Sequence, residues 1–233
     1  MLEAILYAAL AGAMIPLGGV LARAENIRPR WLEQEFRHSV IAFGGGALLA
    51  AVALVLVPQG AEAVPVPVAV LAFGAGGILF AAIDHQLKKE AGPRSQLLAM
   101  VADFVPEAMA LGALFAAGSG SAPLLALLIA MQNLPEGFNA YREQRAGGAA
   151  RTSTLALFVI LALLGPVAAV LGNIYLSEAP AAMGTLMLVS AGGILYLIFE
   201  DIAPQTPLRR AWAPPLGAVA GFALGLAGHL LIH

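Results

Sequence analysis

The sequence predicts an all-α integral membrane protein with eight transmembrane helices and both termini on the outer side. Composition is the first observation: 60% of the 233 residues are hydrophobic and only 11% are charged, whereas a soluble domain carries about 25% charged residues. The second is a series of eight apolar runs, each near the length of about 20 residues that a helix needs to cross a bilayer. The third is the regular placement of the basic residues between these runs.

The charge balance and residue usage exclude several classes of function. Twelve basic residues against 14 acidic ones leave a net charge of -2, so there is no basic surface for nucleic acid. The chain has no cysteine, which excludes disulfide scaffolds, thiol catalysis and cysteine metal sites. Eight spans leave no stretch for a soluble domain. We therefore expect residues 1–233 to form one polytopic transmembrane domain.

The first three spans are bounded by charges or proline. Glu3 near the start of the first run, with no basic segment before it, argues for a span rather than a secretory signal. The second run ends at Pro58, and the third ends at Asp84. These boundaries give spans at Leu2–Ala22, Phe36–Val57 and Val66–Ile83.

The fourth and fifth runs, Leu97–Ala117 and Pro123–Tyr141, are separated only by the turn Gly118–Ser121. A connection this short makes the two helices antiparallel neighbours. The remaining spans are bounded in the same way as the first three, and they are Thr154–Asn173, Ala179–Phe199 and Trp212–Ile232.

The basic residues orient the chain. All twelve fall between or at the edges of spans one and two, three and four, five and six, or seven and eight. Cytoplasmic connections carry an excess of Lys and Arg, so these four connections are inner, and both termini are outer. The protein is expected in the cell membrane, which is the inner membrane in a Gram-negative cell. The residues are Arg23, Arg28, Arg30, Arg37, Lys88, Lys89, Arg94, Arg142, Arg145, Arg151, Arg209 and Arg210.

Three acidic residues lie inside spans rather than at their ends: Asp103 and Glu107 in span four and Glu136 in span five. One ionised carboxylate at the centre of a span costs about 2.5–3.5 kcal/mol. No Lys, Arg or His lies mid-span to neutralise these acids. Either they are protonated, or their counter-charge comes from outside the protein. A transported cation is the natural candidate.

The spacing of these residues places them on facing helices. Asp103 and Glu107 are four residues apart and share one helix face, as do Gln132 and Glu136. Asn133 adjoins Gln132. Because the two helices are antiparallel neighbours, one cation could contact both of them. The side chains therefore predict an oxygen-rich site between spans four and five.

A proline precedes each of two glutamates, at Pro106 and Pro135. Proline kinks a helix and frees the carbonyl four residues earlier, here at Ala102 and Met131. Freed carbonyls are tolerated in a membrane where they line a cavity. The alternative is that the prolines only kink the helices and the acids are neutral packing residues.

The segments Asp103–Glu107 (DFVPE) and Gln132–Gly137 (QNLPEG) resemble the paired His-Asn-x-Pro-Glu-Gly motifs of the ZIP family of divalent-metal transporters. Ser190–Pro204 is similar to the glycine-pair, tyrosine and acidic-x-x-Pro pattern of the family's seventh span. Eight spans with both ends outside is also the family's topology. The resemblance covers nearly the whole chain and implies a ZIP-like helix bundle.

Three departures from the family pattern concern its two-metal centre. Asp103 replaces the family's histidine, Phe104 its asparagine, and Gly165 the glutamate of its span-six Glu-Pro pair. The second metal of the family depends on the last two positions. We therefore expect one principal metal. Its predicted ligands are Asp103, Glu107, Gln132 and Glu136, with Asn133 as a further candidate.

The resemblance implies uptake of a divalent metal toward the cytoplasm and no enzymatic activity or fixed cofactor. It offers Zn²⁺, Fe²⁺, Mn²⁺ or Cd²⁺ as the substrate, and the all-oxygen ligands favour Mn²⁺, Mg²⁺, Ca²⁺ or Fe²⁺ over Zn²⁺. It also implies that Glu200 and Asp201 belong to a release path, the alternative being a solvated helix end. The expected partners are the metal ion and the lipid bilayer, with no nucleic acid and with a homodimer left open.

Three other functions remain open on the sequence alone. The carboxylates could relay protons or sodium for a carrier of another solute. An intramembrane enzyme could use a bound metal for hydrolysis, although the sequence contains no recognisable catalytic set. A homologue that binds metal without transporting it is the third alternative, because the family's histidine, asparagine and glutamate are replaced.

Overall fold

The computed structural model is all helical and describes residues 1–25, 30–89, 94–148, 150–206 and 212–232. Of these residues 90% are helical and none forms a strand. Two π-helical turns, Val52–Leu56 and Ile198–Ile202, join α2 to α3 and α9 to α10. The helices are α1 (Leu2–Ala24), α2 (Arg30–Ala51), α3 (Val57–Glu62), α4 (Val66–Lys89), α5 (Arg94–Ala116), α6 (Ala122–Ala146), α7 (Arg151–Ala162), α8 (Leu164–Tyr175), α9 (Pro180–Leu197), α10 (Ala203–Gln205) and α11 (Ala213–Ile232).

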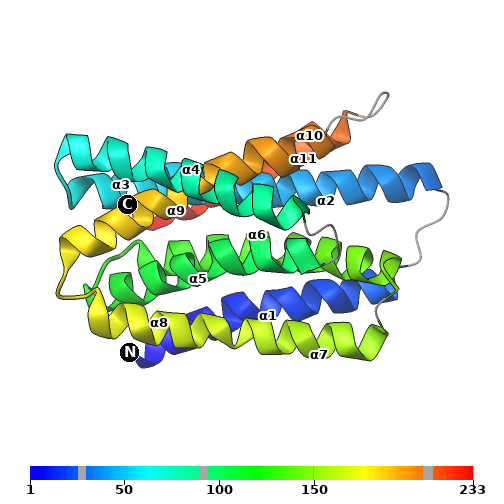
Figure 1. The fold of residues 1–233 in the computed structure, drawn as a ribbon, viewed down its shortest axis with the longest axis horizontal. Coiled ribbons are helices and arrows are strands. Elements are labelled where there is room, and N and C mark those ends of the chain that lie inside the picture. The colour runs from blue at the N-terminus through cyan, green and yellow to red at the C-terminus, as the bar shows by residue number, and fades with distance from the viewer. Residues whose placement is uncertain (26–29, 90–93, 149, 207–211, 233) are drawn as a thin grey trace.

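Within the described ranges these elements form eight rods, one for each apolar run of the sequence (Figure 1). The second rod is α2 with α3, the sixth is α7 with α8, and the seventh is α9 with α10. The beginning of α1 and the end of α11 lie at the same end of the bundle. Several rods continue past the apolar runs, as α4 does to Lys89 and α6 to Ala146, since a helix can extend beyond the apolar part of its sequence.

Six rods are long and apolar enough to cross a membrane: α1, α2 with α3, α4, α7 with α8, α9 with α10, and α11. Their outward faces carry large exposed apolar side chains, for example Leu10, Val70, Ile78 and Leu230. These features indicate a membrane-embedded protein. The set does not include α5 and α6, which carry the acids predicted to lie inside spans, so a topology of eight spans stays a prediction.

The rods pack as two groups, which Figure 1 shows one above the other. The first helix group contains α1, α5, α6, α7 and α8, with α1 packed on α6 and α5 on α8. The second helix group contains α2, α3, α4, α9, α10 and α11, with α2 packed on α11 and α4 on α9. The two groups meet where α2 packs against α6 and α5 against α9. The predicted metal ligands therefore lie on helices that form this boundary.

Glycine allows the closest of these helix contacts. A Cβ atom on Gly137 of α6 would lie 2.2 Å from the carbonyl oxygen of Ile15 on α1, and one on Gly112 of α5 would lie 1.9 Å from that of Ala169 on α8. A Cβ atom on Gly46 of α2 would lie 2.0 Å from the carbonyl oxygen of Ala218 on α11. Small residues at helix interfaces are the usual means of association in a bilayer, where neighbouring lipid is as apolar as the helices.

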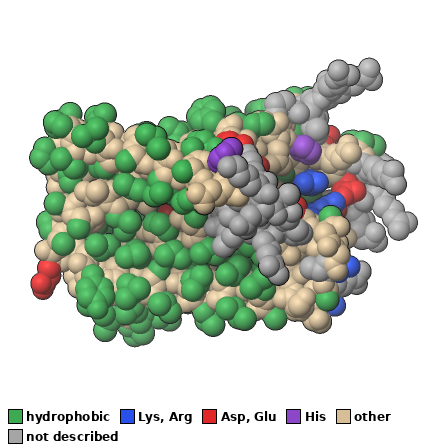
Figure 2. Space-filling model, in the orientation of Figure 1, with side chains coloured by type: hydrophobic (Ala, Val, Ile, Leu, Met, Phe, Trp, Pro, Cys, Tyr) green, Lys and Arg blue, Asp and Glu red, His purple; other side chains and the backbone are tan. Residues whose placement is uncertain are grey.

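Basic side chains gather at the end of the bundle opposite the N-terminus (Figure 2). There Arg142 of α6 forms ion pairs with Glu25, after α1, and Glu33 of α2. This arrangement ties three helices together at the end that the sequence assigns to the inner side. Arg28, Arg209 and Arg210, which belong to the same prediction, lie outside the described residues.

Candidate metal site

The turn between α5 and α6 places the two site helices side by side. Gly118 has φ of 66° in this turn, a left-handed conformation that glycine adopts without steric cost. Farther along the two helices, the Nε2 atom of Gln132 donates a hydrogen bond of 2.5 Å to Oε2 of Glu107. The prediction that these two helices are antiparallel neighbours is confirmed, and Glu107 of α5 faces Gln132 of α6.

The predicted ligands are strongly buried. Asp103 is 3% exposed, and Glu107, Gln132 and Asn133 are 0% exposed, while Glu136 is half-buried. The backbone N–H of Phe104 donates to Oδ1 of Asp103 at 2.8 Å. Such burial is costly for an ionised group unless a counter-charge is present.

Five buried oxygen atoms near the predicted site accept no hydrogen bond. Leaving a buried polar group unpaired costs about 1–3 kcal/mol, so contact with a bound cation or a water molecule would stabilise these atoms. All are carboxylate or amide oxygens, which are the ligands that hard divalent cations prefer. The atoms are Glu107 Oε1, Gln132 Oε1, Asn133 Oδ1, Glu136 Oε2 and Asn139 Oδ1.

The five predicted ligands do not converge on one point. Glu107 and Gln132 form a buried pair, while Asp103 and Glu136 line a cavity. Asn133 turns toward α1, where its Nδ2 atom donates to the carbonyl oxygen of Ala11 at 2.9 Å. Among the described residues, no three His, Cys, Asp or Glu side chains lie close enough to hold a metal ion. The predicted ligands thus fall into a buried pair, Glu107 with Gln132, and two carboxylates at the cavity wall, Asp103 and Glu136.

The cavity has a volume of about 170 Å³ and is lined by carboxylates from both helix groups. Asp103 and Glu136 come from the first helix group, and Asp84, Glu200 and Asp201 come from the second. Among the residues that the structure describes, no Lys, Arg or His belongs to its lining. Concave surfaces of one charge sign concentrate ions of the opposite sign, so this cavity attracts cations.

The two residues predicted for a release path, Glu200 and Asp201, lie on the π-helical turn Ile198–Ile202. Such turns inside helices are frequent at functional sites. Gln205 donates a hydrogen bond of 2.7 Å to Oδ1 of Asp201. Glu200 and Asp201 share the cavity with Asp103 and Glu136.

Glu143 lies just beyond the predicted fifth span. Burial and the Asp201 carboxylate raise the pKa of Glu143, and Arg37 opposes this effect.

Asp84 and Asn139 line the cavity and were not singled out as ligands from the sequence. Asp84 accepts a hydrogen bond of 3.1 Å from the hydroxyl of Tyr196, and its position at the end of an apolar run gave no sign of its partner. Asn139 lies three residues after Glu136 and so on the same face of α6. That spacing was the signal that could have identified it.

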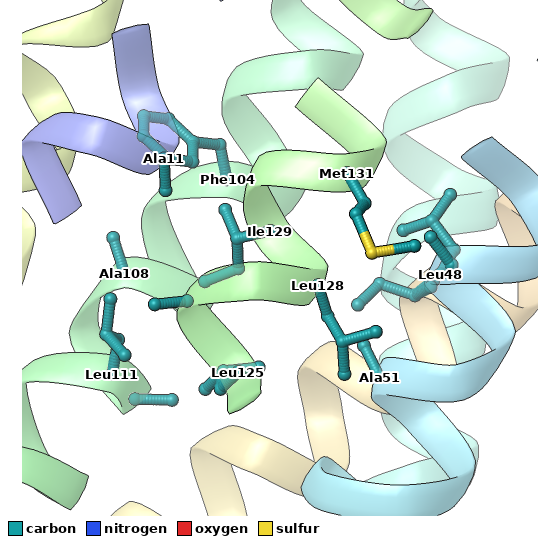
Figure 3. Packing of buried hydrophobic residues seen from close by; sticks show 14 of the residues in the cluster. Ala11, Leu48, Ala51, Phe104, Ala108, Leu111, Leu125, Leu128, Ile129 and Met131 are labelled. Carbon is teal, nitrogen blue, oxygen red and sulfur yellow. The ribbon is translucent and has the colours of Figure 1, made fainter. Parts of the chain in front are cut away.

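The two prolines lie within continuous helices, α5 and α6. Ala102, whose carbonyl Pro106 leaves without its helical partner, lines the cavity. Met131, the corresponding residue for Pro135, instead packs in the apolar core toward Leu48 of α2 (Figure 3). Only the first of the two freed carbonyls therefore belongs to a residue of the cavity wall.

Apolar packing fills the part of α5 and α6 nearer their connecting turn. Leu111 of α5 and Leu125, Leu128 and Ile129 of α6 are 0% exposed, and Figure 3 shows Leu128 and Met131 directed toward α2. The cavity lies on the other side of this layer, toward the end where the arginines gather. The apolar layer therefore separates the cavity from the N-terminal end of the bundle, and we expect access to the cavity from the opposite end.

This asymmetry predicts a sided labelling pattern, which the absence of native cysteine makes simple to measure. Ala102→Cys should react with a membrane-impermeant maleimide in inside-out vesicles and not in right-side-out vesicles. Leu125→Cys, buried in the apolar layer, is the control and should react in neither. Labelling of Ala102→Cys from the outer side alone would contradict the orientation, and its labelling from neither side would contradict an open cavity.

No protein-family model and no curated protein matches the sequence. The likeness to the ZIP family therefore rests on the motifs in the sequence.

Proposed function

We propose that this chain is a ZIP-like transporter that carries a divalent metal cation of the zinc, iron or manganese class across a membrane toward the cytoplasm. The observation that carries the proposal is the set of unpaired, buried carboxylate and amide oxygens on α5 and α6 beside an acidic cavity. A divalent cation would neutralise the acids and satisfy the oxygens at once. The metal is the substrate, and no resident cofactor is part of the proposal.

The position of the site at the boundary of the two helix groups supports a transport cycle. Asp103 and Glu136 belong to the first helix group, and Glu200 and Asp201 belong to the second. Movement of one group against the other would expose the site to alternate sides, as in transporters whose substrate lies between two structural units. Glu200 and Asp201 would receive the ion as it leaves the first helix group.

Packing around Phe104 supports a single principal metal position. Phe104 is 1% exposed, and a Cβ atom on Gly165 would lie 2.5 Å from its ring atom Cζ. The ring therefore fills the space that a longer side chain at position 165 would need. These are the two positions on which the second metal of the ZIP family depends.

Uptake by the purified chain in liposomes tests the proposal. With Mn²⁺, Fe²⁺, Zn²⁺, Cd²⁺ and Mg²⁺ supplied in turn, we expect saturable accumulation of at least one ion above that of empty liposomes. The oxygen ligands favour Mn²⁺ or Fe²⁺ among these ions. The absence of accumulation for all five ions would overturn the proposal.

One observation favours a second candidate, a carrier that uses the carboxylates to bind protons or sodium. Asp103 is 3% exposed and Glu107 is 0% exposed, and a bound proton or Na⁺ would offset the cost of burying an ionised carboxylate. Uptake of a divalent ion, measured against pH and against Na⁺, separates the two functions. Inhibition of a measured metal flux by low pH fits competition of protons for metal ligands, whereas a Na⁺ or proton flux without any metal flux would favour the second candidate.

A further inference from the structure

Asn139 of α6 is a buried carboxamide in the wall of the acidic cavity. It is 6% exposed, it lines the cavity with Asp103 and Glu136, and its Oδ1 atom has no hydrogen-bond partner. Its position three residues after Glu136 puts both side chains on one helix face. Asn139 is not among the metal ligands predicted from the sequence.

The surroundings of Asn139 do not explain its unpaired oxygen. An ionised carboxylate only accepts hydrogen bonds, and the other acids of the cavity are carboxylates too. A rotation of the amide by half a turn exchanges its oxygen and nitrogen without a change of shape, and in either orientation the oxygen needs a donor or a cation as its partner. A cation can contact the amide oxygen and the carboxylates together.

We propose that Asn139, together with Asp103 and Glu136, forms a cation position at the cavity wall, distinct from the buried Glu107–Gln132 pair. This inference rests on the proposed function. Two carboxylates and a neutral amide oxygen form a hard ligand set. Asn139 is the neutral member of this set and biases the position toward Mn²⁺ and away from ions that prefer nitrogen ligands, such as Zn²⁺.

Calorimetric titration of the full chain with Mn²⁺ and, separately, with Zn²⁺ tests the assignment. Asn139→Ala should weaken Mn²⁺ binding about tenfold or more, since even indirect partners of a metal change affinity by about 10–100-fold. Asn139→Asp should tighten Mn²⁺ binding by adding a charge. Asn139→His should shift the preference toward Zn²⁺, which binds imidazole well.

Asn173→Ala is the matched control. The Nδ2 atom of Asn173 donates to the carbonyl oxygen of Gly112 at 3.1 Å, and Asn173 does not line the cavity, so its removal should leave both affinities unchanged. Unchanged affinities in all three Asn139 variants, with metal binding lost in Glu136→Gln, would overturn the role of Asn139 and leave the transport proposal standing. If the unmodified chain binds neither ion, both proposals fall. Should Asn139→Ala not fold, the aspartate and histidine variants decide the question.

Discussion

Glu107→Gln and Glu136→Gln, made one at a time, should each reduce divalent-metal uptake by about 100-fold or more. Loss of a residue that only supports a metal ligand lowers affinity or activity by about 10–100-fold, and loss of a ligand itself should cost at least as much. Each substitution removes a negative charge and a strong ligand while keeping the size of the side chain. Gln132 can still donate its hydrogen bond to an amide oxygen at position 107. We therefore expect folded protein that does not transport, measured as initial uptake rates in proteoliposomes beside elution profiles from gel filtration.

The matched control is Glu62→Gln, at the exposed end of α3. The same change of Glu to Gln there removes a charge from the surface and no ligand from the site, so uptake should stay at the unmodified rate. Unchanged uptake in both site variants would remove Glu107 and Glu136 from the transport site. A large loss in the control as well would attribute the effect to overall charge rather than to ligation.

Phe104→Ala should cause the largest loss of stability, about 3–5 kcal/mol, the usual cost of truncating a buried phenylalanine to alanine. The ring is 1% exposed and lies between glycines of two other helices. A Cβ atom on Gly12 would be 3.2 Å from its Cζ atom, and one on Gly165 would be 2.5 Å away. Because Gly12 and Gly165 have no side chains, they cannot fill the space that the ring leaves.

Denaturant unfolding in detergent measures this effect, and Phe199→Ala is its control. Phe199 is 69% exposed, so the same truncation leaves no internal cavity. We expect its free energy of unfolding to remain close to that of the unmodified protein. Equal losses in the two variants would contradict the assignment of Phe104 as a packing residue.

Hydrophobic runs and turn residues predict most of the fold, because a span needs a long apolar stretch and a helix end needs a boundary. The division of the sixth rod between Ala162 and Leu164 was not predicted, although its cause is visible in the sequence. Pro166 has no N–H to donate to the carbonyl of Ala162, and α7 ends at that residue.

The candidate site shows where local spacing reaches its limit. Helical periodicity and the short Gly118–Ser121 turn suffice to predict that Glu107 and Gln132 lie on facing helices. They cannot predict that Asn133 turns to Ala11, which is 122 positions away in the sequence. The same holds for Asp84, which the packing of α4 on α9 brings to the cavity. Such contacts depend on how whole helices pack, which a local pattern does not contain.

Anomalous diffraction from crystals of the protein grown with Mn²⁺ tests the central claim most directly, because it locates the ion. The proposal predicts a manganese peak between α5 and α6, at coordination distance from carboxylate oxygens of Glu107 or Glu136, and the loss of that peak in the Glu107→Gln, Glu136→Gln double variant. A peak found only away from these residues, or one that persists unchanged in the double variant, would contradict the claim that the buried carboxylates hold the transported metal.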